Sequence, residues 1–388
     1  RVKPSDIYSD YFPYIDISAV DSKTKMLKRT FRLNVGGAPG RARQLVHAGD
    51  VIFATTRPYL ENIASINEQH DKAIASTGFC VMSPNKDFIN SDYLFFLVSS
   101  RYFIDKVLVH QKGASYPAVS DKDILNIEIP LPPVGEQKKI VARIEKQFAK
   151  IDEVARLRAV SEATTAALLP AALHEIFSSA ESKGWEIVTF GNESCMQIVD
   201  GDRGKNYPSK IEFSPNGFCL FLNTSNVRRG DFNFSRMDFI SKEKDELLRK
   251  GKMMRGDVVL TTRGTLGNTA YYGPDVPYEA MRINSGMVIL RVNPHRILQD
   301  YLLYIMNSNE FVQAIKEANS GSAQPQLPIK VLSKLTLPLP PLAEQKKIVK
   351  KLDVLAEKVR ALQTLQSQQA ADLKALKQSI LHEAFTGK

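Results

Sequence analysis

An internal repeat constrains this sequence more than any other feature. Residues 129–141, IPLPPVGEQKKIV, recur 208 positions later as residues 337–349, LPLPPLAEQKKIV. The same spacing carries the tripeptide Asp-Tyr-Leu from residues 92–94 to 300–302, and Leu-His-Glu from 173–175 to 381–383. This period is far longer than the roughly 20–50 residues of a solenoid repeat. The sequence therefore predicts a tandem duplication of one domain together with the segment that follows it.

The first part of each copy combines strand and helix patterns. Residues 51–54 and 258–260 are short apolar runs after a Gly-Asp pair, which is typical of buried strands. Residues 90–100 and 298–308 predict short helices that open near an acidic residue. Glycine-rich and polar stretches between these elements predict loops. Each copy is therefore expected to begin with a mixed α/β domain.

The two copies differ at their starts. The second opens with Trp185-Glu186-Ile187-Val188, whereas residues 14–18 already align with residues 221–225. We therefore expect the N-terminal part of the first domain, roughly 20 to 30 residues, to be missing. The first residue, Arg1, is not methionine, so the natural chain is expected to begin earlier.

The second part of each copy predicts a long helix that follows a Pro-Pro pair. Apolar residues of the second copy alternate in steps of three and four, as in a coiled-coil seam. The seam comprises Ile348, Leu352, Leu355, Val359, Leu362, Gln366, Gln369, Leu373, Leu376 and Ile380. The first copy begins a similar seam, but Pro170 is expected to kink or end its helix at a cost of about 3 kcal/mol. A narrow apolar stripe is unstable alone, so each helix is expected to pair antiparallel with its own duplicate.

Charge and cysteine content narrow the class of protein. The formal net charge is +10, from 52 Lys and Arg against 42 Asp and Glu, which favours an anionic partner such as nucleic acid. The three scattered cysteines exclude a disulfide scaffold and are typical of a reducing cytoplasm. No apolar run approaches the roughly 20 residues that span a bilayer, and the first ten residues are polar. We therefore expect a cytoplasmic protein with no membrane partner.

Catalytic motifs do not recur in the two copies. The sequence contains no phosphate-binding loop, no dinucleotide-binding glycine motif, no Asn/Asp-Pro-Pro-Tyr/Phe tetrapeptide and no His-Glu-x-x-His. A duplicated enzyme should repeat its chemistry, so we expect a non-catalytic chain without a metal or cofactor of its own. Two alternatives stay open: an enzyme acting alone, and a coiled-coil scaffold that does not read DNA sequence.

Polar loop positions that recur with different identities are the candidate DNA contacts. Arginine, lysine, glutamine and serine can contact phosphates or base edges. For the arginines the alternative is a structural ion pair, and for the loops it is an ordinary turn or solvated charge. The candidates are Thr56, Arg57, Tyr59, Lys112, Ser115, Tyr116, Arg203, Lys205, Asn223, Arg228, Arg229, Thr262, Arg263, Ser322, Gln324 and Gln326.

The chain resembles the specificity (S) subunits of type I restriction-modification systems. Residues 131–141 and 339–349 carry the resemblance, supported by the two Gly-Asp-Val runs, the loop at 320–326 and the terminal LHEAFTG. It covers essentially the whole chain, in the same order and twice. It implies an α+β fold with two mixed α/β target-recognition domains, separated by two long helices that pair as an antiparallel coiled coil, with an internal pseudo-twofold duplication.

The resemblance also implies a domain layout and partners. Residues 1–133 and 181–341 would be the target-recognition domains, each reading one half of a bipartite site in double-stranded DNA. Residues 134–180 and 342–388 would be the conserved helical regions that set the spacing and dock two methyltransferase (M) subunits. Those subunits would hold S-adenosylmethionine, and restriction (R) subunits would use ATP and Mg²⁺. The S subunit itself would be non-catalytic.

Overall fold

The computed structural model describes residues 1–318 and 326–387. The chain divides into two compact units, each described by itself below. Unit 1 contains Arg1–Val160 and Gln366–Lys388, and unit 2 contains Ser161–Leu365. Both boundaries fall inside long helices, so each unit holds parts of both helices. The domain boundaries expected from the sequence stay a prediction.

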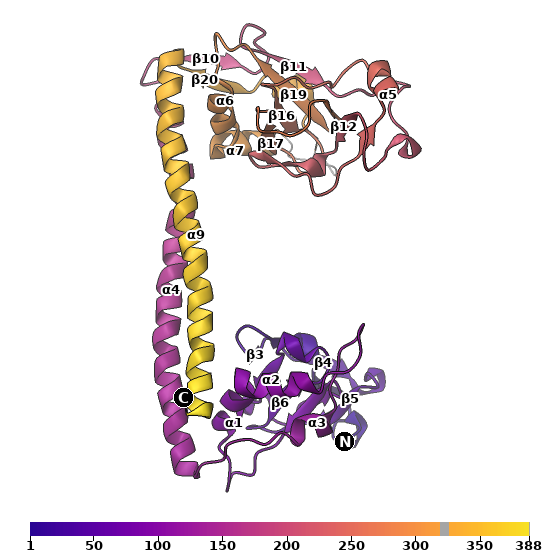
Figure 1. The fold of residues 1–388 in the computed structure, drawn as a ribbon, viewed down its shortest axis with the longest axis vertical. Helices are drawn as coiled ribbons and strands as arrows, with labels where there is room; N and C mark the ends of the chain where they lie inside the picture. The colour runs from indigo at the N-terminus through magenta and orange to yellow at the C-terminus, as the bar shows by residue number, and fades with distance from the viewer. Residues whose placement is uncertain (319–325, 388) are drawn as a thin grey trace. The chain divides into compact units, whose positions relative to one another are not determined.

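Unit 1 contains two small sheets, a two-stranded ribbon and three short helices (Figure 1). The sheets have the strand orders β4-β1-β8-β5 and β7-β6-β9, and β1 runs parallel to β8. The elements are β1 (Tyr11–Ile15), β2 (Val20–Asp21), β3 (Met26–Leu27), β4 (Phe31–Asn34), β5 (Ala42–Leu45), β6 (Val51–Ala54), β7 (Ile63–Ser65), β8 (Ile74–Ser76), β9 (Phe79–Met82), α1 (Ser91–Val98), α2 (Arg101–Val109), α3 (Asp121–Leu125) and the first part of α4 (Val134–Ser178).

Strand β6 lies at the centre of unit 1 and is buried on both faces. Val51 and Phe53 belong to the apolar cluster that includes side chains of α1 and α2. Ile52 and Ala54 point to the other face, into a second cluster. Burying a side chain the size of Phe53 stabilises a fold by about 1.5–3 kcal/mol. The short apolar run predicted from the sequence is therefore a strand covered on both sides.

Unit 2 repeats this plan with additional strands. Its sheets have the orders β11-β19-β16-β17 and β15-β12-β18, with β12 parallel to β18, and two ribbons pair β10 with β20 and β13 with β14. The elements are β10 (Glu186–Thr189), β11 (Met196–Asp200), β12 (Cys219–Leu222), β13 (Val227–Arg228), β14 (Asp231–Phe232), β15 (Phe239–Ile240), α5 (Lys242–Leu247), β16 (Val258–Thr261), β17 (Thr269–Tyr271), β18 (Met281–Ile283), β19 (Met287–Val292), α6 (Gln299–Met306), α7 (Asn309–Glu317), α8 (Ile329–Leu332), β20 (Thr336–Leu339) and the first part of α9 (Leu342–Thr386).

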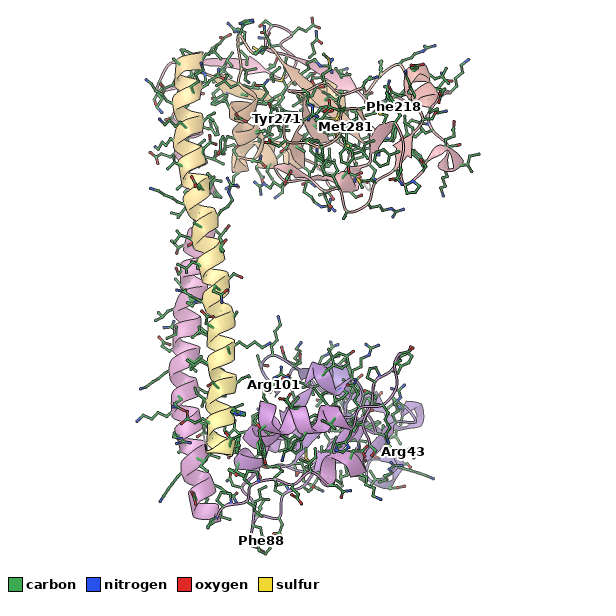
Figure 2. All side chains as sticks on the ribbon, in the orientation of Figure 1. Arg43, Phe88, Arg101, Phe218, Tyr271 and Met281 are labelled. Atoms are coloured by element: carbon green, nitrogen blue, oxygen red, sulfur yellow. The ribbon has the colours of Figure 1, made fainter. Side chains whose placement is uncertain are left out.

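The strands of the two units correspond one to one at the centre of each fold. β7-β6-β9 matches β17-β16-β19, and the parallel pair β1-β8 matches β12-β18. Met281 of β18, labelled in Figure 2, is fully buried, as is Ile74 at the start of β8. The mixed α/β content and this internal correspondence confirm the predicted fold class.

The long helices pair antiparallel within each unit. In unit 1, Val141 and Ile144 near the start of α4 share a cluster with Leu381 and Phe385 near the end of α9. In unit 2, Ile348 and Leu352 near the start of α9 share a cluster with Leu173 and Ile176 near the end of α4. The repeated Leu-His-Glu tripeptide therefore contributes a buried leucine, Leu173 or Leu381, to the core of each unit.

Equivalent aromatic contacts fix these helix ends to the domains. The ring of Phe385 meets Tyr93 of α1 edge to face at 5.3 Å between centroids. The ring of Phe177 meets Tyr301 of α6 in the same way at 6.0 Å. Such pairs contribute about 0.5–1.5 kcal/mol beyond their buried area. Each unit is therefore built from one domain and two helix ends that are distant in sequence.

Two expectations about the helices need correction. Helix α4 continues through Pro170 to Ser178, so the proline does not end it. The seam predicted in α9 is buried at Ile348, Leu352, Val359 and Gln366, whereas Leu362, Gln369 and Leu376 are exposed. A strict heptad pattern therefore describes only part of α9.

Candidate nucleic-acid interface

In unit 1, the loop after β6 lies against the loop between α2 and α3. The backbone N–H of Arg57 donates to Pro117 O at 2.7 Å, and Val119 N donates to Thr55 O at 2.9 Å. Thr55 N in turn donates to Gly78 O, beyond the end of β8, at 2.8 Å. We call residues 55–61 and 112–118 the unit 1 loop pair.

All six candidate residues of the first copy lie on the unit 1 loop pair and are exposed. They are Thr56, Arg57, Tyr59, Lys112, Ser115 and Tyr116. The guanidinium carbon of Arg57 lies 5.9 Å from the centroid of the Tyr116 ring, a cation–π distance. Gly113 has a φ of +91°, and a Cβ there would lie 2.9 Å from Tyr116 O, so this turn requires glycine. The tight turn thus presents Ser115 and Tyr116 at its tip.

In unit 2, several strands end at one edge of the fold. β11 and β16 both run antiparallel to β19, and β12 runs parallel to β18, so the loops after these strands are brought together. Thr262 N donates to Gly286 O at 2.8 Å, Asn284 N donates to Leu222 O at 3.1 Å, and Leu327 N donates to Thr262 O at 2.9 Å. We call residues 200–205, 223–226, 262–268 and 284–286, together with Gln326, the unit 2 loop edge.

The unit 2 loop edge brings together candidates that are far apart in sequence. Arg263 forms an isolated β-bridge with Gln326, and Arg203 donates to Ser285 O at 3.4 Å and pairs with Asp200 at 3.2 Å. Asn223 accepts from Ser225 N at 2.8 Å, which shapes the turn after β12. Lys205 is exposed on the same edge, whereas the Thr262 side chain is buried. The exposed members can reach a ligand. Thr262 instead contributes backbone hydrogen bonds to Gly286 and Leu327.

The remaining candidates of the second copy lie outside the unit 2 loop edge. Arg228 lies in β13, beside the unit 2 loop edge, because Asn268 donates to Val227 O at 3.0 Å. Arg229 donates to Asn307 O at 2.7 Å at the end of α6, so its guanidinium stabilises a helix terminus. Ser322 and Gln324 lie outside the described residues. Among the described residues, neither Arg57 nor Arg263 pairs with a carboxylate, so the ion-pair alternative is not observed for them.

The hydrogen bonds also correct the alignment of the two loops. Matching Thr55-Thr56-Arg57 to Thr261-Thr262-Arg263 by sequence uses an offset of 206. However, Thr55 and Thr262 make the equivalent bonds to Gly78 and Gly286, and Thr56 and Arg263 make the equivalent bridges to Ala118 and Gln326. Thr56, not Arg57, is therefore the structural counterpart of Arg263.

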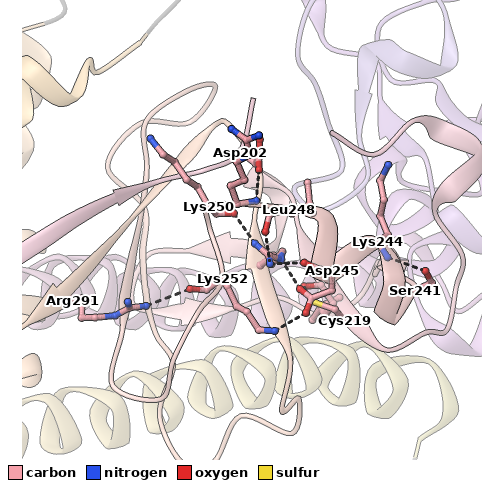
Figure 3. A network of polar contacts seen from close by, with 12 residues as sticks. Asp202, Cys219, Ser241, Lys244, Asp245, Leu248, Lys250, Lys252 and Arg291 are labelled. Atoms are coloured by element: carbon pink, nitrogen blue, oxygen red, sulfur yellow. Dashed lines mark hydrogen bonds and ion pairs between the residues drawn. The ribbon is translucent and has the colours of Figure 1, made fainter. Parts of the chain in front are cut away.

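A buried ionic network supports the unit 2 loop edge (Figure 3). Asp245 is fully buried and accepts from Lys252 Nζ at 2.6 Å and from Arg282 Nε at 2.5 Å. Arg282 also donates to Lys250 O at 2.7 Å, and Asp202 accepts from Arg249 N at 2.7 Å. Nothing in the sequence pattern signals this network, because Asp245 and Arg282 are 37 positions apart.

The network keeps its carboxylates charged. Burial alone would raise the pKa of Asp245, but hydrogen bonds from Lys252 and Arg282 hold that pKa below its ordinary value. Burial likewise opposes ionisation of Asp202, and backbone N–H donors, those of Gly204 and Arg249 foremost, outweigh it and lower the pKa. Residues 202–205 and 249–252 are therefore fixed by charge-assisted hydrogen bonds.

The repeated Glu-Gln-Lys-Lys block contributes a structural glutamine to each unit. Gln137 is fully buried; it accepts from Asn90 N at 2.8 Å and donates to Phe88 O at 2.8 Å and Pro132 O at 2.7 Å. Gln345 makes the same three contacts in unit 2, with Leu298 N, Arg296 O and Pro340 O, each at 2.9 Å. The glutamine fixes each long helix to its domain, and the neighbouring lysines stay exposed.

Two absences among the described residues bear on other functions. No group of three or more His, Cys, Asp or Glu side chains there is arranged to hold a metal ion. Within the same residues, none of the helices is both long enough and apolar enough to cross a membrane.

Known proteins resemble this chain in both sequence and architecture. The family model for the type I restriction modification DNA specificity domain matches residues 6–160 and 183–370. The specificity subunit of the Escherichia coli type I restriction enzyme EcoBI is 20% identical over 338 residues, which cover 82% of this chain and 70% of the relative. The MjaVIII specificity subunit of Methanocaldococcus jannaschii is 25% identical over 344 residues, which cover 82% and 74%.

Solved structures extend the match over the whole chain. A chain from a study of complex assembly and conformational transition of the type I restriction-modification system is 34% identical, with a TM-score of 0.80 over 100% of this chain and 94% of that one. The HsdS subunit of Thermoanaerobacter tengcongensis is also 34% identical, with a TM-score of 0.58 over 100% and 93%. These matches set aside both the lone enzyme and the scaffold that does not read DNA. The chain belongs to the family of type I restriction-modification DNA specificity subunits, which recognise DNA and are themselves non-catalytic.

Proposed function

We propose that the unit 1 loop pair and the unit 2 loop edge each read one half of a bipartite DNA site. One observation carries this proposal: the same loop framework recurs in both units but presents different side chains. Thr56 and Ala118 in unit 1 occupy the bridge that Arg263 and Gln326 form in unit 2. Since base edges are distinguished by donor and acceptor pattern, two frameworks with different side chains suit two different half-sites.

Sequencing of methylated DNA tests this proposal directly. The chain would be expressed with its methyltransferase subunits in cells that lack other DNA methylation, and the methylated sites mapped. We expect one bipartite motif with an unread gap. Replacing residues 1–133 with the corresponding part of another specificity subunit should change one half of the motif only. A motif without two separate halves, or no motif at all, would contradict the proposal.

The long helices are proposed to dock two methyltransferase subunits. Exposed apolar side chains on the helices support this, because such side chains are typical of interaction surfaces. In unit 1 they are Val154, Leu157 and Val160 of α4, and in unit 2 they are Val354, Leu362 and Leu365 of α9. The related specificity subunits are named as parts of type I restriction enzymes, and one solved relative comes from a study of complex assembly.

The proposed complex distributes its chemistry among partners. The methyltransferase subunits would hold S-adenosylmethionine, and restriction subunits would use ATP and Mg²⁺, whereas this chain supplies DNA recognition. All of these activities act on DNA inside the cell, so we propose that the complex works in the cytoplasm. Co-purification of this chain with methyltransferase subunits at a ratio of one to two would support the assembly. A complex with a single such subunit would contradict it.

A further inference from the structure

The loop after the central strand has two left-handed backbone positions in each unit. In unit 2 these positions are Gly264, with a φ of +69°, and Gly267, with a φ of +80°. In unit 1 they are Arg57, with a φ of +50°, and Glu61, with a φ of +55°. Glycine adopts this conformation without cost, whereas an ordinary L-residue is strained in it. Unit 1 thus carries charged side chains at the two positions where unit 2 carries glycines.

Hydrogen bonds at both ends of the loop establish this correspondence. At its start, Thr55 and Thr262 donate to Gly78 O and Gly286 O, each at 2.8 Å. At its end, Ala54 N donates to Asn62 O at 3.0 Å, and Thr261 N donates to Asn268 O at 2.9 Å. Counting inward from these fixed points places Arg57 on Gly264 and Glu61 on Gly267. The unit 1 loop has one additional residue between them.

Glu61 has a structural reason to replace glycine. Its carboxylate pairs with Lys25 Nζ at 2.8 Å and with Arg101 at 3.0 Å, and its side chain is largely buried. Arg101, labelled in Figure 2, begins helix α2, so Glu61 connects the loop to this helix and to the turn at Lys25. These ion pairs offset the strain of the left-handed backbone.

Arg57, in contrast to Glu61, has no ion pair that would offset the strain of its left-handed backbone. Among the described residues its side chain forms no ion pair or hydrogen bond, and it is exposed. Its guanidinium lies over the exposed ring of Tyr116, which belongs to the other half of the loop pair. A strained residue whose side chain the fold does not use is a candidate for function.

We propose that Arg57 is a DNA-contacting residue of unit 1 without a counterpart in unit 2, placed at a left-handed position at the expense of strain. This inference rests on the proposed function of the unit 1 loop pair. The chemistry it offers is a planar cationic fork, which binds either the O6 and N7 edge of guanine or a phosphate oxygen. The Tyr116 ring limits where the guanidinium can lie, which favours one orientation toward the duplex.

Substitution of Arg57 by glycine separates the effect of its backbone on stability from the effect of its side chain on DNA affinity. In R57G the backbone regains the residue type that unit 2 uses, so the apparent Tm should stay within about 2 °C of the wild type, because relieved strain and added chain entropy oppose each other. The affinity of the full complex with its methyltransferase subunits for a duplex carrying its mapped site should fall by about 5- to 150-fold. R57N, which also tolerates this backbone, should lose affinity in the same way.

Two controls address charge and backbone. Lys72 is also basic, exposed and left-handed, with a φ of +63°, but it precedes β8, at the end of that strand away from Gly78. K72G should therefore leave the affinity within about twofold. E61G places glycine at the other left-handed position of the same loop but removes the ion pairs to Lys25 and Arg101, so it should lower the Tm by more than R57G does.

The pattern of loss identifies the ligand atom. A base contact would relax discrimination at one position of the half-site read by unit 1, whereas a phosphate contact would weaken all sequences alike and reduce the salt slope by about one. Wild-type affinity in both R57G and R57N, or an equal loss in K72G, would overturn the inference. A wild-type complex without sequence preference would instead refute the proposed function, so the two failures can be distinguished.

Discussion

Asp245 and Arg282 place two opposite charges inside unit 2. Both side chains are almost completely buried, and Lys252 completes the group from a more exposed position. Removing one partner of a buried pair leaves an uncompensated charge, which costs about 3–5 kcal/mol. We expect D245N to lower the free energy of unfolding of unit 2 by this amount in urea denaturation. E279Q, which removes the exposed partner of Arg255, should change it by less than about 1 kcal/mol.

The Asp245–Arg282 pair also predicts that the stability of unit 2 depends on pH in the acidic range. Because the folded-state pKa of Asp245 is held below its ordinary value of 3.8, its contribution to stability is present above that value and is lost as the pH falls through the folded-state pKa. We therefore expect the stability difference between wild type and D245N to shrink below about pH 4. Urea denaturation at a series of pH values measures this. A difference that stays constant down to pH 3 would show that Asp245 does not contribute through its charge.

Gln137 and Gln345 are the residues that determine where each long helix meets its domain. Q345A would leave Leu298 N, Arg296 O and Pro340 O without their partner. An unsatisfied buried group costs about 1–3 kcal/mol, and a partly exposed one costs less because water can replace the lost partner. We expect a loss of about 2–4 kcal/mol in unit 2, with faster hydrogen exchange at the start of α6. The exposed Gln369 gives the control: Q369A should be close to neutral. Unchanged exchange at α6 in Q345A would mean that the glutamine does not fix the helix.

Regular elements followed from the sequence, whereas the contacts that position the loops did not. The apolar run at 51–54 and the helix at 298–308 are present as β6 and α6, because burial on a strand or helix leaves a local pattern. The pairing of β1 with β8, and of Asp245 with Arg282, joins residues that are distant in the chain and therefore leaves no local pattern in the sequence. Pro170 was expected to kink or end a helix, and α4 does not end there but continues through it to Ser178.

The candidate site was predictable in part for the same reason. All six candidates of the first copy lie together and exposed, because the sequence repeat marks loops that fall at equivalent places. Identity alone could not align Arg57 correctly, since one inserted residue between two left-handed positions shifts the match with Arg263. The burial of Thr262 and the helix-capping role of Arg229 depend on tertiary contacts. Whether the candidates contact DNA stays a prediction.

At the scale of the whole molecule, each long helix has 45 residues and passes from one unit into the other. The chain therefore connects its two proposed readers through continuous helices rather than through a flexible linker. A helix transmits a change in length directly, at about 1.5 Å per residue. If the helices set the distance between the half-sites, the length of the gap in the DNA site should depend on the number of residues in them.

Matched insertions test this dependence. Seven residues with the heptad pattern would be inserted after Val160 in α4 and after Leu365 in α9, where both helices cross from one unit to the other. The added length is about 10 Å, which corresponds to about three base pairs at a rise of about 3.4 Å. Mapping of methylated sites should therefore show a gap about three base pairs longer, with the same bases read in each half. An insertion in α4 alone should reduce methylation, because it shifts one helix relative to the other. An unaltered gap in an active complex with both insertions would rule out a measuring role for the helices.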